Sequence, residues 1–382
     1  MKPPRDRWAD TLATVRTLIT IREPGAGPIP LVIEGDRFTD PDDGPIDDEI
    51  RTGHLYALPG LADCHAHLGV GSIGQMGTLS DDEIRTNCVA NAWIQVEGGV
   101  LLIADKGSSS DVSLEILETP PATRPAMQMA GRVISSPGGY YPGYGHEVDD
   151  AGLADAVRSA CATRASWVKI IGDWPRRGVG TQANFAEGAL RTAVEIAHAA
   201  GCRVAVHTMA PEGIGPAVVA GVDSVEHGLF LAGNDLPELA ERGGAWVPTI
   251  LGAEAIIEML GADSTGGRLL AEGVGNVREL LPGAERLGLT ILTGTDLAVP
   301  HGRVAHEAIR LHELGLSKEA TLRAVTTAAF DYLGVTHGFS SGMPANAVFF
   351  ADDPRDHLET LLEPQVIIRA GRIVPAQSSR RR

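Results

Sequence analysis

The stretch "LPGLADCHAHLGV", residues 58–70, places Asp63, His65 and His67 at alternate positions of an otherwise apolar segment. Alternate side chains of an extended strand point to the same face, so the carboxylate and both imidazoles are predicted to lie together. Two neutral imidazole nitrogens can share one metal ion. A His-x-His pair is a weak signal by itself, and its interpretation depends on the rest of the chain.

A lysine in the apolar segment "WVKII", residues 167–171, is the second unusual feature. The ammonium of Lys169 would be buried there, and a buried charge needs a partner or loses its proton. A structural ion pair is one interpretation. The other is a neutral amine that reacts with carbon dioxide, which turns the side chain into an anionic carbamate with two oxygen ligands for metal ions.

Three more polar residues end apolar segments: His207 in "VAVHTMA", His227 in "SVEHGLF" and Asp296 in "LTGTDLA". Taken singly, either histidine is more simply a hydrogen-bonded core residue, and Asp296 a helix cap. Together with the His-x-His pair they give four imidazoles at the ends of strands, which packing alone does not explain. A carboxylate such as Asp296 can bind a metal and also accept a proton from metal-bound water.

The elements that must position these residues are short apolar runs alternating with amphipathic helical patterns over residues 61–335. This alternation predicts an α/β fold, a (β/α)8 TIM-type barrel, in which active-site residues lie at the carboxyl ends of the strands. Eight strands are expected, at residues 61–68, 99–106, 125–131, 166–173, 202–208, 223–228, 245–251 and 290–296.

Both ends of the chain have a different pattern. Residues 12–57 and 346–374 contain alternating apolar segments separated by Gly, Pro and Asp turns. We expect a small discontinuous β-sandwich domain made of residues 1–60 and 336–382, beside a metal-binding barrel of residues 61–335.

Composition excludes several classes of partner. The formal net charge of -17 would repel a phosphate backbone, and the basic run "SSRRR" at the C-terminus is interpreted as a solvated tail. The four cysteines have no CxxC spacing, which predicts buried thiols in a reducing compartment. Because no segment has the pattern of a signal peptide or a membrane span, we expect a cytoplasmic protein that binds no nucleic acid and no membrane.

These residues, in this order and with the opening "LPGLADCHAHL", resemble the metal-dependent amidohydrolase superfamily. The segments "WVKIIGDW", "AHAAGCRVAVHTMAPEGIGPAVVAGVDSVEHGLFL" and "GTDLAVPHG" are similar to its branch of imidazolonepropionase-related hydrolases, prolidase-like Xaa-Pro dipeptidases and arginine carboxypeptidases. The similarity extends over nearly the whole chain. It departs at "IADKGSSS", where relatives often have an Arg-Asp-containing turn, so a substrate contact from that loop is not carried over.

The resemblance implies a binuclear centre, with zinc as the default ion and manganese, iron or cobalt as alternatives. It implies attack by a metal-bridging hydroxide with Asp296 as general base, and Asp63 either orients a ligand or makes a structural hydrogen bond. The implied ligands are His65, His67 and Asp296 for one ion, His207 and His227 for the other, and N6-carboxylysine at Lys169 for both.

Loops after the third, fourth and eighth strands are expected to contact a small-molecule substrate. "SSPGGYYPGYGHEVDD" supplies Tyr140, Tyr144 and His146, as a substrate wall or as a rigid surface turn. His146 is also a candidate donor to an oxyanion. Arg176 could clamp a substrate carboxylate or remain solvated, and His301 could reach the pocket rim or stabilise its own loop.

The leading prediction is therefore a hydrolase of amide-type C–N bonds in peptide-like or N-acyl amino acid substrates, acting as a homo-oligomer. A lactone or carbamate hydrolase with the same centre is an alternative. A heterocycle deaminase is another, although Ala210 stands where those relatives have a glutamate. A non-enzymatic scaffold is disfavoured because all six ligand positions are filled.

Overall fold

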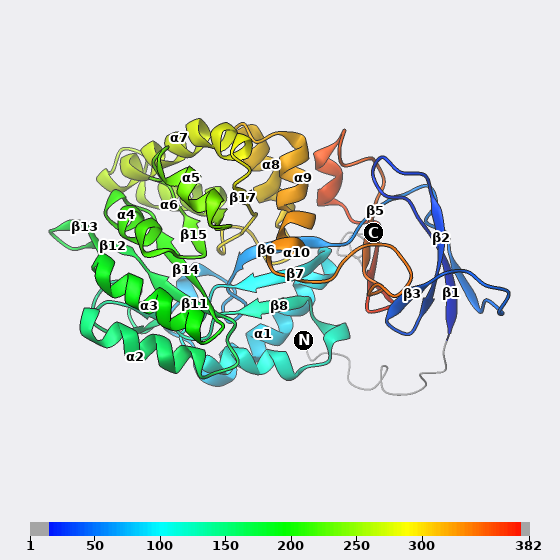
Figure 1. The fold of residues 1–382 in the computed structure, drawn as a ribbon, viewed down its shortest axis with the longest axis horizontal. Helices are drawn as coiled ribbons and strands as arrows, with labels where there is room; N and C mark the ends of the chain where they lie inside the picture. The colour runs from blue at the N-terminus through cyan, green and yellow to red at the C-terminus, as the bar shows by residue number, and fades with distance from the viewer. Residues whose placement is uncertain (1–14, 376–382) are drawn as a thin grey trace.

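The computed structural model describes residues 15–375, so the first part of the predicted N-terminal domain and the "SSRRR" tail lie outside the described residues. Parallel strands and helices alternate through the middle of the chain (Figure 1). One parallel sheet has the order β6-β7-β8 and the other β10-β9-β11-β14-β15-β16-β17. Their bounds are β6 Leu61–Ala66, β7 Val100–Asp105, β8 Ala126–Met129, β9 Val133–Ser135, β10 Gly145–Glu147, β11 Trp167–Ile171, β14 Arg203–Thr208, β15 Ser224–His227, β16 Ala245–Val247 and β17 Thr290–Ile291.

Backbone contacts connect the two parallel sheets at both edges. At one edge, Ala130 after β8 forms a parallel bridge with Trp167 of β11. At the other, the Cys64 N–H of β6 donates to the Thr293 carbonyl at 2.8 Å, after β17. Gly294 allows this approach, because a Cβ at that position would lie 2.4 Å from the His65 Cβ. The segment that carries Asp296 is thereby held against the strand that carries the His-x-His pair.

Helices cover the outer face of the parallel strands. The alternation of β11 and β14 follows the period of two, since Val168, Ile170, Val204 and Val206 pack outward with helical residues while Trp167 packs in a separate inner cluster. A capping box formed by Ser80 and Glu83 starts α1. The helices are α1 Asp81–Glu97, α2 Asp150–Cys161, α3 Glu187–Ala199, α4 Pro211–Ala220, α5 Asp235–Glu241, α6 Ile250–Leu260, α7 Thr265–Arg286, α8 Ala305–Glu313, α9 Lys318–Ala324 and α10 Thr327–Tyr332.

All eight predicted strands are shorter in the structure than in the prediction, and the seventh and eighth are shortened most. The seventh was expected to run through Leu251, but α6 begins at Ile250. The eighth was expected through Asp296, whereas regular pairing ends at Ile291 and the chain turns with positive φ at Asp296 and Leu297. Side chains that follow these strands therefore sit on irregular backbone, which strand periodicity does not describe.

Strands from both chain ends lie at one end of the molecule, coloured blue and red in Figure 1. The sheet orders are β3-β2-β1-β4 and β20-β19-β18-β5, and β5 from the N-terminal part pairs antiparallel with β18. Ile19, Ile33, Ala57, Phe349 and Ile368 share one buried cluster across the two sheets. The bounds are β1 Arg16–Ile21, β2 Ile29–Glu34, β3 Arg37–Thr39, β4 Asp48–Ile50, β5 Tyr56–Leu58, β18 Ala347–Phe350, β19 Val366–Arg369 and β20 Arg372–Val374, and a separate hairpin is formed by β12 Asp173–Arg176 and β13 Gly180–Ala183.

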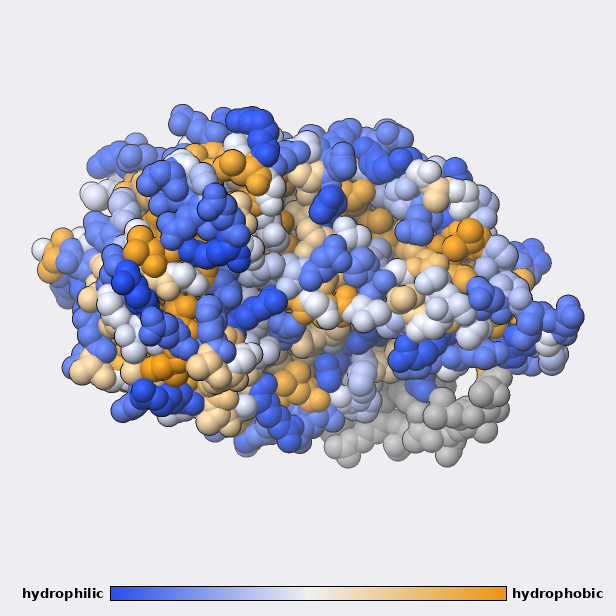
Figure 2. All heavy atoms as spheres, viewed as in Figure 1, coloured by the Kyte–Doolittle hydropathy of each residue, from blue (hydrophilic) through white to orange (hydrophobic). Residues whose placement is uncertain are grey.

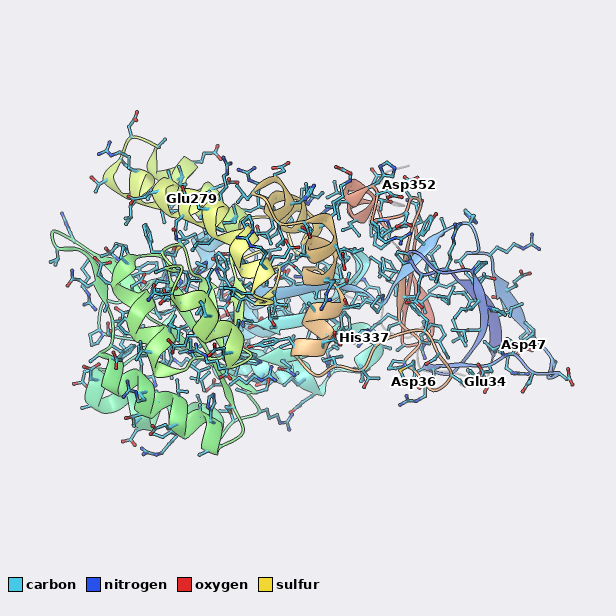
Figure 3. All side chains as sticks on the ribbon, turned by 45° about the horizontal axis from the view of Figure 1, so that its top comes forward. Glu34, Asp36, Asp47, Glu279, His337 and Asp352 are labelled. Carbon is cyan, nitrogen blue, oxygen red and sulfur yellow. The ribbon has the colours of Figure 1, made fainter. Side chains whose placement is uncertain are left out.

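The surface is rich in charged side chains, as the charged composition of the chain predicts. Figure 2 shows a face that is mostly hydrophilic, with apolar atoms in scattered patches. Acidic side chains such as Glu34, Asp47 and Glu279 lie on the outside of their elements (Figure 3). Within residues 15–375, the helices are all too short or too polar to cross a membrane.

Candidate metal centre

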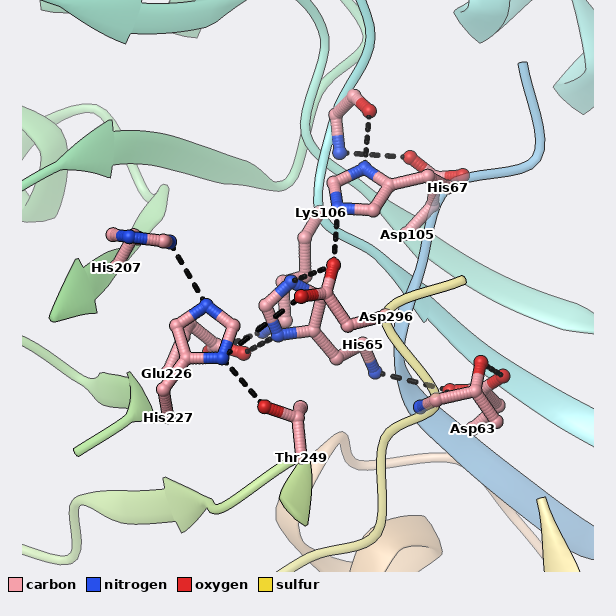
Figure 4. Close-up of polar contacts among 12 residues, drawn as sticks. Asp63, His65, His67, Asp105, Lys106, His207, Glu226, His227, Thr249 and Asp296 are labelled. Atoms are coloured by element: carbon pink, nitrogen blue, oxygen red, sulfur yellow. Dashed lines mark hydrogen bonds and ion pairs between the residues drawn. The ribbon is translucent and has the colours of Figure 1, made fainter. Parts of the chain in front are cut away.

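His65, His67 and Asp296 form a compact group at the carboxyl ends of the parallel strands (Figure 4). The Asp296 Oδ1 lies 3.4 Å from His65 Nε2 and 3.3 Å from His67 Nε2. Ligand atoms held 2.0–2.1 Å from a tetrahedral ion stand about 3.3 Å apart, so the three atoms have the spacing of a shared metal site. Both imidazoles are 1% exposed, whereas the Asp296 side chain is 21% exposed and remains accessible to a substrate.

The other ring nitrogen of each of these histidines has its own acceptor. His67 Nδ1 lies 2.8 Å from the Gly107 carbonyl, and His65 Nδ1 lies 2.7 Å from Glu226 Oε2. The hydrogen bond at His67 Nδ1 fixes the tautomer that leaves its Nε2 free as a metal ligand, whereas the contact of His65 with Glu226 has an ion-pair distance without hydrogen-bond geometry. The loop that supplies the Gly107 carbonyl is itself held by the Asp105 carboxylate, which accepts from the Leu68 and Gly107 N–H groups.

His207 and His227 form a second group on the neighbouring strands β14 and β15. His207 Nδ1 and His227 Nε2 are 2.8 Å apart, and His227 Nδ1 contacts the Thr249 hydroxyl. Burial lowers the pKa of both imidazoles well below the ordinary value. Both rings are therefore neutral, which is the form that binds metal.

Backbone conformation brings His227 into the site. Glu226 and His227 are adjacent, and a regular strand would send them to opposite faces. Instead His227 has φ of 63°, in the left-handed region, and its ring centroid lies 5.0 Å from that of His65. Such a conformation costs about 1–3 kcal/mol in a residue other than glycine, and it is concentrated at functional sites.

Lys169 is buried among these histidines without a partner. Its side chain is 1% exposed, and within the described part of the chain its Nζ makes no hydrogen bond. Burial lowers the pKa of Lys169 to about 8. The charge of Lys106 also lowers this pKa, while the carboxylates of Glu226 and Asp296 raise it. The amine is therefore far easier to deprotonate than an exposed lysine, which carbamate formation requires.

Two buried residues that sequence reasoning did not identify are Lys106 and Glu226. Lys106 Nζ lies 2.9 Å from Glu226 Oε1, and the two side chains are 2% and 0% exposed. Burial raises the pKa of the Glu226 carboxyl, but the ammonium groups of Lys106 and Lys169 lower it by more, so the net shift is downward. A signal was available, because both are charged residues near the carboxyl ends of predicted strands, as Lys169 is.

Asp63 binds strand ends together. Its carboxylate accepts from the Thr295 N–H at 3.1 Å, the Thr295 hydroxyl at 2.7 Å and the His65 N–H at 3.2 Å. Gln95 of α1 lies within 3.3 Å of it as well. The residue therefore holds the backbone beside Asp296 against the backbone of His65.

The predicted substrate residues fall into different surroundings. Tyr140 is 8% exposed, with its ring centroid 5.8 Å from that of His207. The Tyr144 hydroxyl donates to the Gly107 carbonyl at 3.1 Å, which places this residue against the loop that contacts His67. His146 is half-buried in β10, and His301 is 8% exposed, with Nε2 3.0 Å from the Val70 carbonyl.

Arg176 makes three hydrogen bonds. Its guanidinium donates to the Pro137 carbonyl at 2.9 Å, the Ser136 hydroxyl at 2.7 Å and the Asn184 side-chain oxygen at 3.1 Å. These bonds tie the loop after β9 to the hairpin that ends before α3. A contact between Arg176 and a substrate carboxylate stays a prediction.

Solved structures show which class of protein has this architecture. A Xaa-Pro dipeptidase with bound methionine has a TM-score of 0.80 at 23% identity, with 94% of this chain and 99% of that chain covered. Ochratoxinase of A. niger has a TM-score of 0.77 at 20% identity, with 94% and 96% covered. The chain shares the fold of these proteins and of a solved amidohydrolase, so the predicted resemblance is confirmed for the fold.

A closer relative by sequence is an uncharacterized protein of Mycobacterium tuberculosis. It is 31% identical over 329 residues, which cover 83% of this chain and 85% of that protein. No protein-family model matches the sequence. The chain belongs to the family of the mycobacterial protein.

Proposed function

We propose that the protein is a binuclear metal-dependent hydrolase that cleaves amide-type C–N bonds. The observation that supports this most is the position of Lys169: its buried Nζ lies among the two groups of histidines and makes no hydrogen bond with the residues that the structure describes. An apolar core does not require such a residue, whereas a carbamate formed on it would be stabilised by cations on both sides.

Six residues provide the ligand atoms for two ions. Divalent ions, with zinc as the default, suit the mixed nitrogen and oxygen set, and when bound they lower the pKa of water and polarise a carbonyl group. His65, His67 and Asp296 would hold the first ion, His207 and His227 the second, and carboxylated Lys169 both.

Asp296 is placed to move the proton in this reaction. Its side chain is the more exposed member of the first group, and its Oδ2 lies 4.0 Å from His227 Nδ1, so the carboxylate faces both groups. It can accept the proton of the attacking water and pass it to the nitrogen of the leaving amine. The overall reaction adds water across the C–N bond and releases a carboxylic acid and an amine.

Tyr140 is the donor best placed to contact the substrate carbonyl. Its ring contacts those of Trp174 and His207, at centroid distances of 4.7 and 5.8 Å. Burial, and then the charge of Asp296, raise the pKa of Tyr140 well above its ordinary value, so the phenol keeps its proton. A protonated phenol beside the centre can donate to the oxygen on which negative charge develops.

The substrate class is proposed as peptide-like or N-acylated amino acids. The solved structures that share the fold include a dipeptidase and an ochratoxinase, so the fold alone does not select the substrate. A lactone or carbamate has a carbonyl that the same centre could attack, and it remains the second candidate. A library of dipeptides, N-acyl amino acids and lactones, tested on metal-replete enzyme, distinguishes the two.

The proposal also covers the overall architecture, the oligomeric state and the cellular location. The contacts between Cys64 and Thr293 and between Ala130 and Trp167 support closure of the parallel strands into a (β/α)8 barrel over residues 61–335. The cluster shared by the two terminal sheets supports one discontinuous β-sandwich domain of residues 1–60 and 336–382. A cytoplasmic homo-oligomer is proposed on sequence grounds.

The Lys169→Ala variant tests the metal centre. We expect wild-type enzyme to contain two ions per chain, and the variant to lose at least one ion and more than about 100-fold in activity, which exceeds the usual effect of losing an outer contact of a metal ligand. Metal analysis and hydrolysis rates measure both effects. Lys318→Ala, at an exposed lysine of α9, is the control. Fewer than two ions in wild-type enzyme, or full activity of Lys169→Ala, would contradict the proposal.

A further inference from the structure

Two lysines lie in the interior, and their surroundings differ. Lys169 makes no hydrogen bond within residues 15–375, while Lys106 Nζ lies 2.9 Å from Glu226 Oε1 and 4.3 Å from the centre of the Trp167 ring. The binuclear centre uses Lys169 and gives no role to Lys106. The Lys106–Glu226 pair therefore needs a separate explanation.

Glu226 links this pair to the first metal group. Its Oε1 accepts from the Ser224 hydroxyl at 2.6 Å as well as facing Lys106. Its Oε2 lies 2.7 Å from His65 Nδ1, and neither atom makes a hydrogen bond with another described residue. One carboxylate thus contacts a buried ammonium with one oxygen and a candidate metal ligand with the other (Figure 4).

Stability does not account for the pair. Removing two charges from water is expensive, and an apolar pair of similar volume is often as stable or more stable. A buried carboxylate is explained if its second oxygen orients a group that chemistry needs. His65 is such a group, because its Nε2 faces Asp296 at 3.4 Å while its Nδ1 faces Glu226.

We propose that Glu226 is a positioning residue for His65 and that Lys106 holds Glu226 in place for this role. The inference rests on the proposed binuclear function. It states that the Lys106–Glu226 pair increases the affinity of the first metal site. Glu226 keeps the His65 ring in the orientation and tautomer that present Nε2 to the ion. Lys106 supplies the counter-charge that keeps the carboxylate turned toward it, with Oε2 left facing His65.

Metal affinity tests the inference without depending on a known substrate. Apoprotein is titrated with Co²⁺ and, in competition with a chelator, with Zn²⁺. We expect Glu226→Gln to weaken the first ion about 10–100-fold and to leave the second unchanged. The same comparison in a His207→Ala background, which removes a ligand of the second group, isolates the first site. Lys106→Met is expected to weaken the first ion in the same direction.

A matched control is Asp173→Asn, at another carboxylate that is 1% exposed and accepts from the Met209 and Ala210 N–H groups. It is expected to leave the first ion at wild-type affinity. If Glu226→Gln does not fold, the double variant Lys106→Met with Glu226→Gln removes both charges and is titrated in its place. We expect that variant to fold and still to bind the first ion weakly.

Two outcomes would overturn the inference alone. One is a folded Glu226→Gln, or folded double variant, that binds both ions with wild-type affinity. The other is an equal loss of the first ion in Asp173→Asn, which would show a general effect of neutralising a buried carboxylate. Wild-type protein that binds fewer than two ions would instead overturn the proposed function, and the inference with it.

Discussion

Tyr140 and Tyr144 belong to the same loop, yet their hydroxyl groups have different surroundings. Tyr144 is 0% exposed, and its hydroxyl donates to the Gly107 carbonyl. The ring of Tyr140 packs instead against those of His207 and Trp174. Its phenol therefore lies beside a candidate metal centre, where a substrate can meet it.

Tyr140→Phe removes this hydroxyl and keeps the ring. We expect kcat for the best amide substrate to fall about 100- to 1000-fold, the usual effect of losing one oxyanion donor, with KM and metal content little changed. Steady-state kinetics and metal analysis measure the three quantities. Tyr141→Phe is the comparison, because Tyr141 packs on Trp174 at 5.0 Å. A loss of kcat in Tyr141→Phe but not in Tyr140→Phe would assign the substrate contact to Tyr141 and contradict the prediction.

At the scale of elements, the start of α6 is capped from another helix. Its N-cap residue Thr249 has φ of 47° and makes no side-chain cap bond. Glu307 of α8 accepts from the Ile250 N–H at 2.7 Å and from the Leu251 N–H at 3.0 Å instead. The capped turn holds Thr249, whose hydroxyl contacts His227 Nδ1. Helix packing therefore fixes the orientation of a candidate metal ligand.

Glu307 also makes stability depend on pH. Burial raises the pKa of its carboxyl from 4.5 to about 8 in the folded protein. The folded state thus holds a proton that the unfolded state loses, so this contribution is complete below pH 4.5 and is lost as pH rises through about 8, at up to about 1.4 kcal/mol per pH unit.

Glu307→Gln mimics the protonated acid. We expect urea unfolding to give similar free energies of unfolding for wild type and variant near pH 4.5. At pH 8 we expect the variant to be more stable by more than about 1.4 kcal/mol. Asp105 and Asp173 also titrate in this range, but they are common to both proteins and cancel in the difference. Parallel stability profiles for the two proteins would contradict the assignment.

At the scale of the whole molecule, the proposed ligands come from five strand ends that are far apart in the chain. His65 and Asp296 are brought together where β6 meets the segment after β17, and Lys169, His207 and His227 extend the site along three neighbouring strands. An ion bound to such a set crosslinks the folded state and has no equivalent site in the unfolded chain.

Removal of metal should therefore lower thermal stability. At free metal 100 times the dissociation constant, one ion stabilises the fold by about 2.7 kcal/mol, so we expect chelation to reduce Tm by several degrees and metal return to restore it. Calorimetry with and without chelator measures the shift. Asp296→Asn should show a smaller shift, while Asp352→Asn, at an exposed carboxylate, should behave as wild type. Equal Tm values for loaded and chelated wild type would contradict a structural contribution of the metal.

Much of the fold follows from local pattern. Alternation between β and α segments predicted most of the parallel strands but not β9 and β10. The period of two in β11 separates Trp167 and Lys169 from the outward Val168 and Ile170. The ends of the strands could not be predicted equally well, because the residues after β16 and β17 adopt positive φ under tertiary constraints. Periodicity contains no information about such turns.

The candidate site, like the fold, could be predicted only in part from the sequence. Types of side chain and their order determined which residues could bind metal, since imidazoles, a lysine and a carboxylate at strand ends are visible in the sequence itself. Only the tertiary structure decided which of them meet and what surrounds them. It placed Glu226 against His65, gave Lys106 a partner and left Lys169 without one, because these contacts join strands whose separation along the chain says nothing about distance in space.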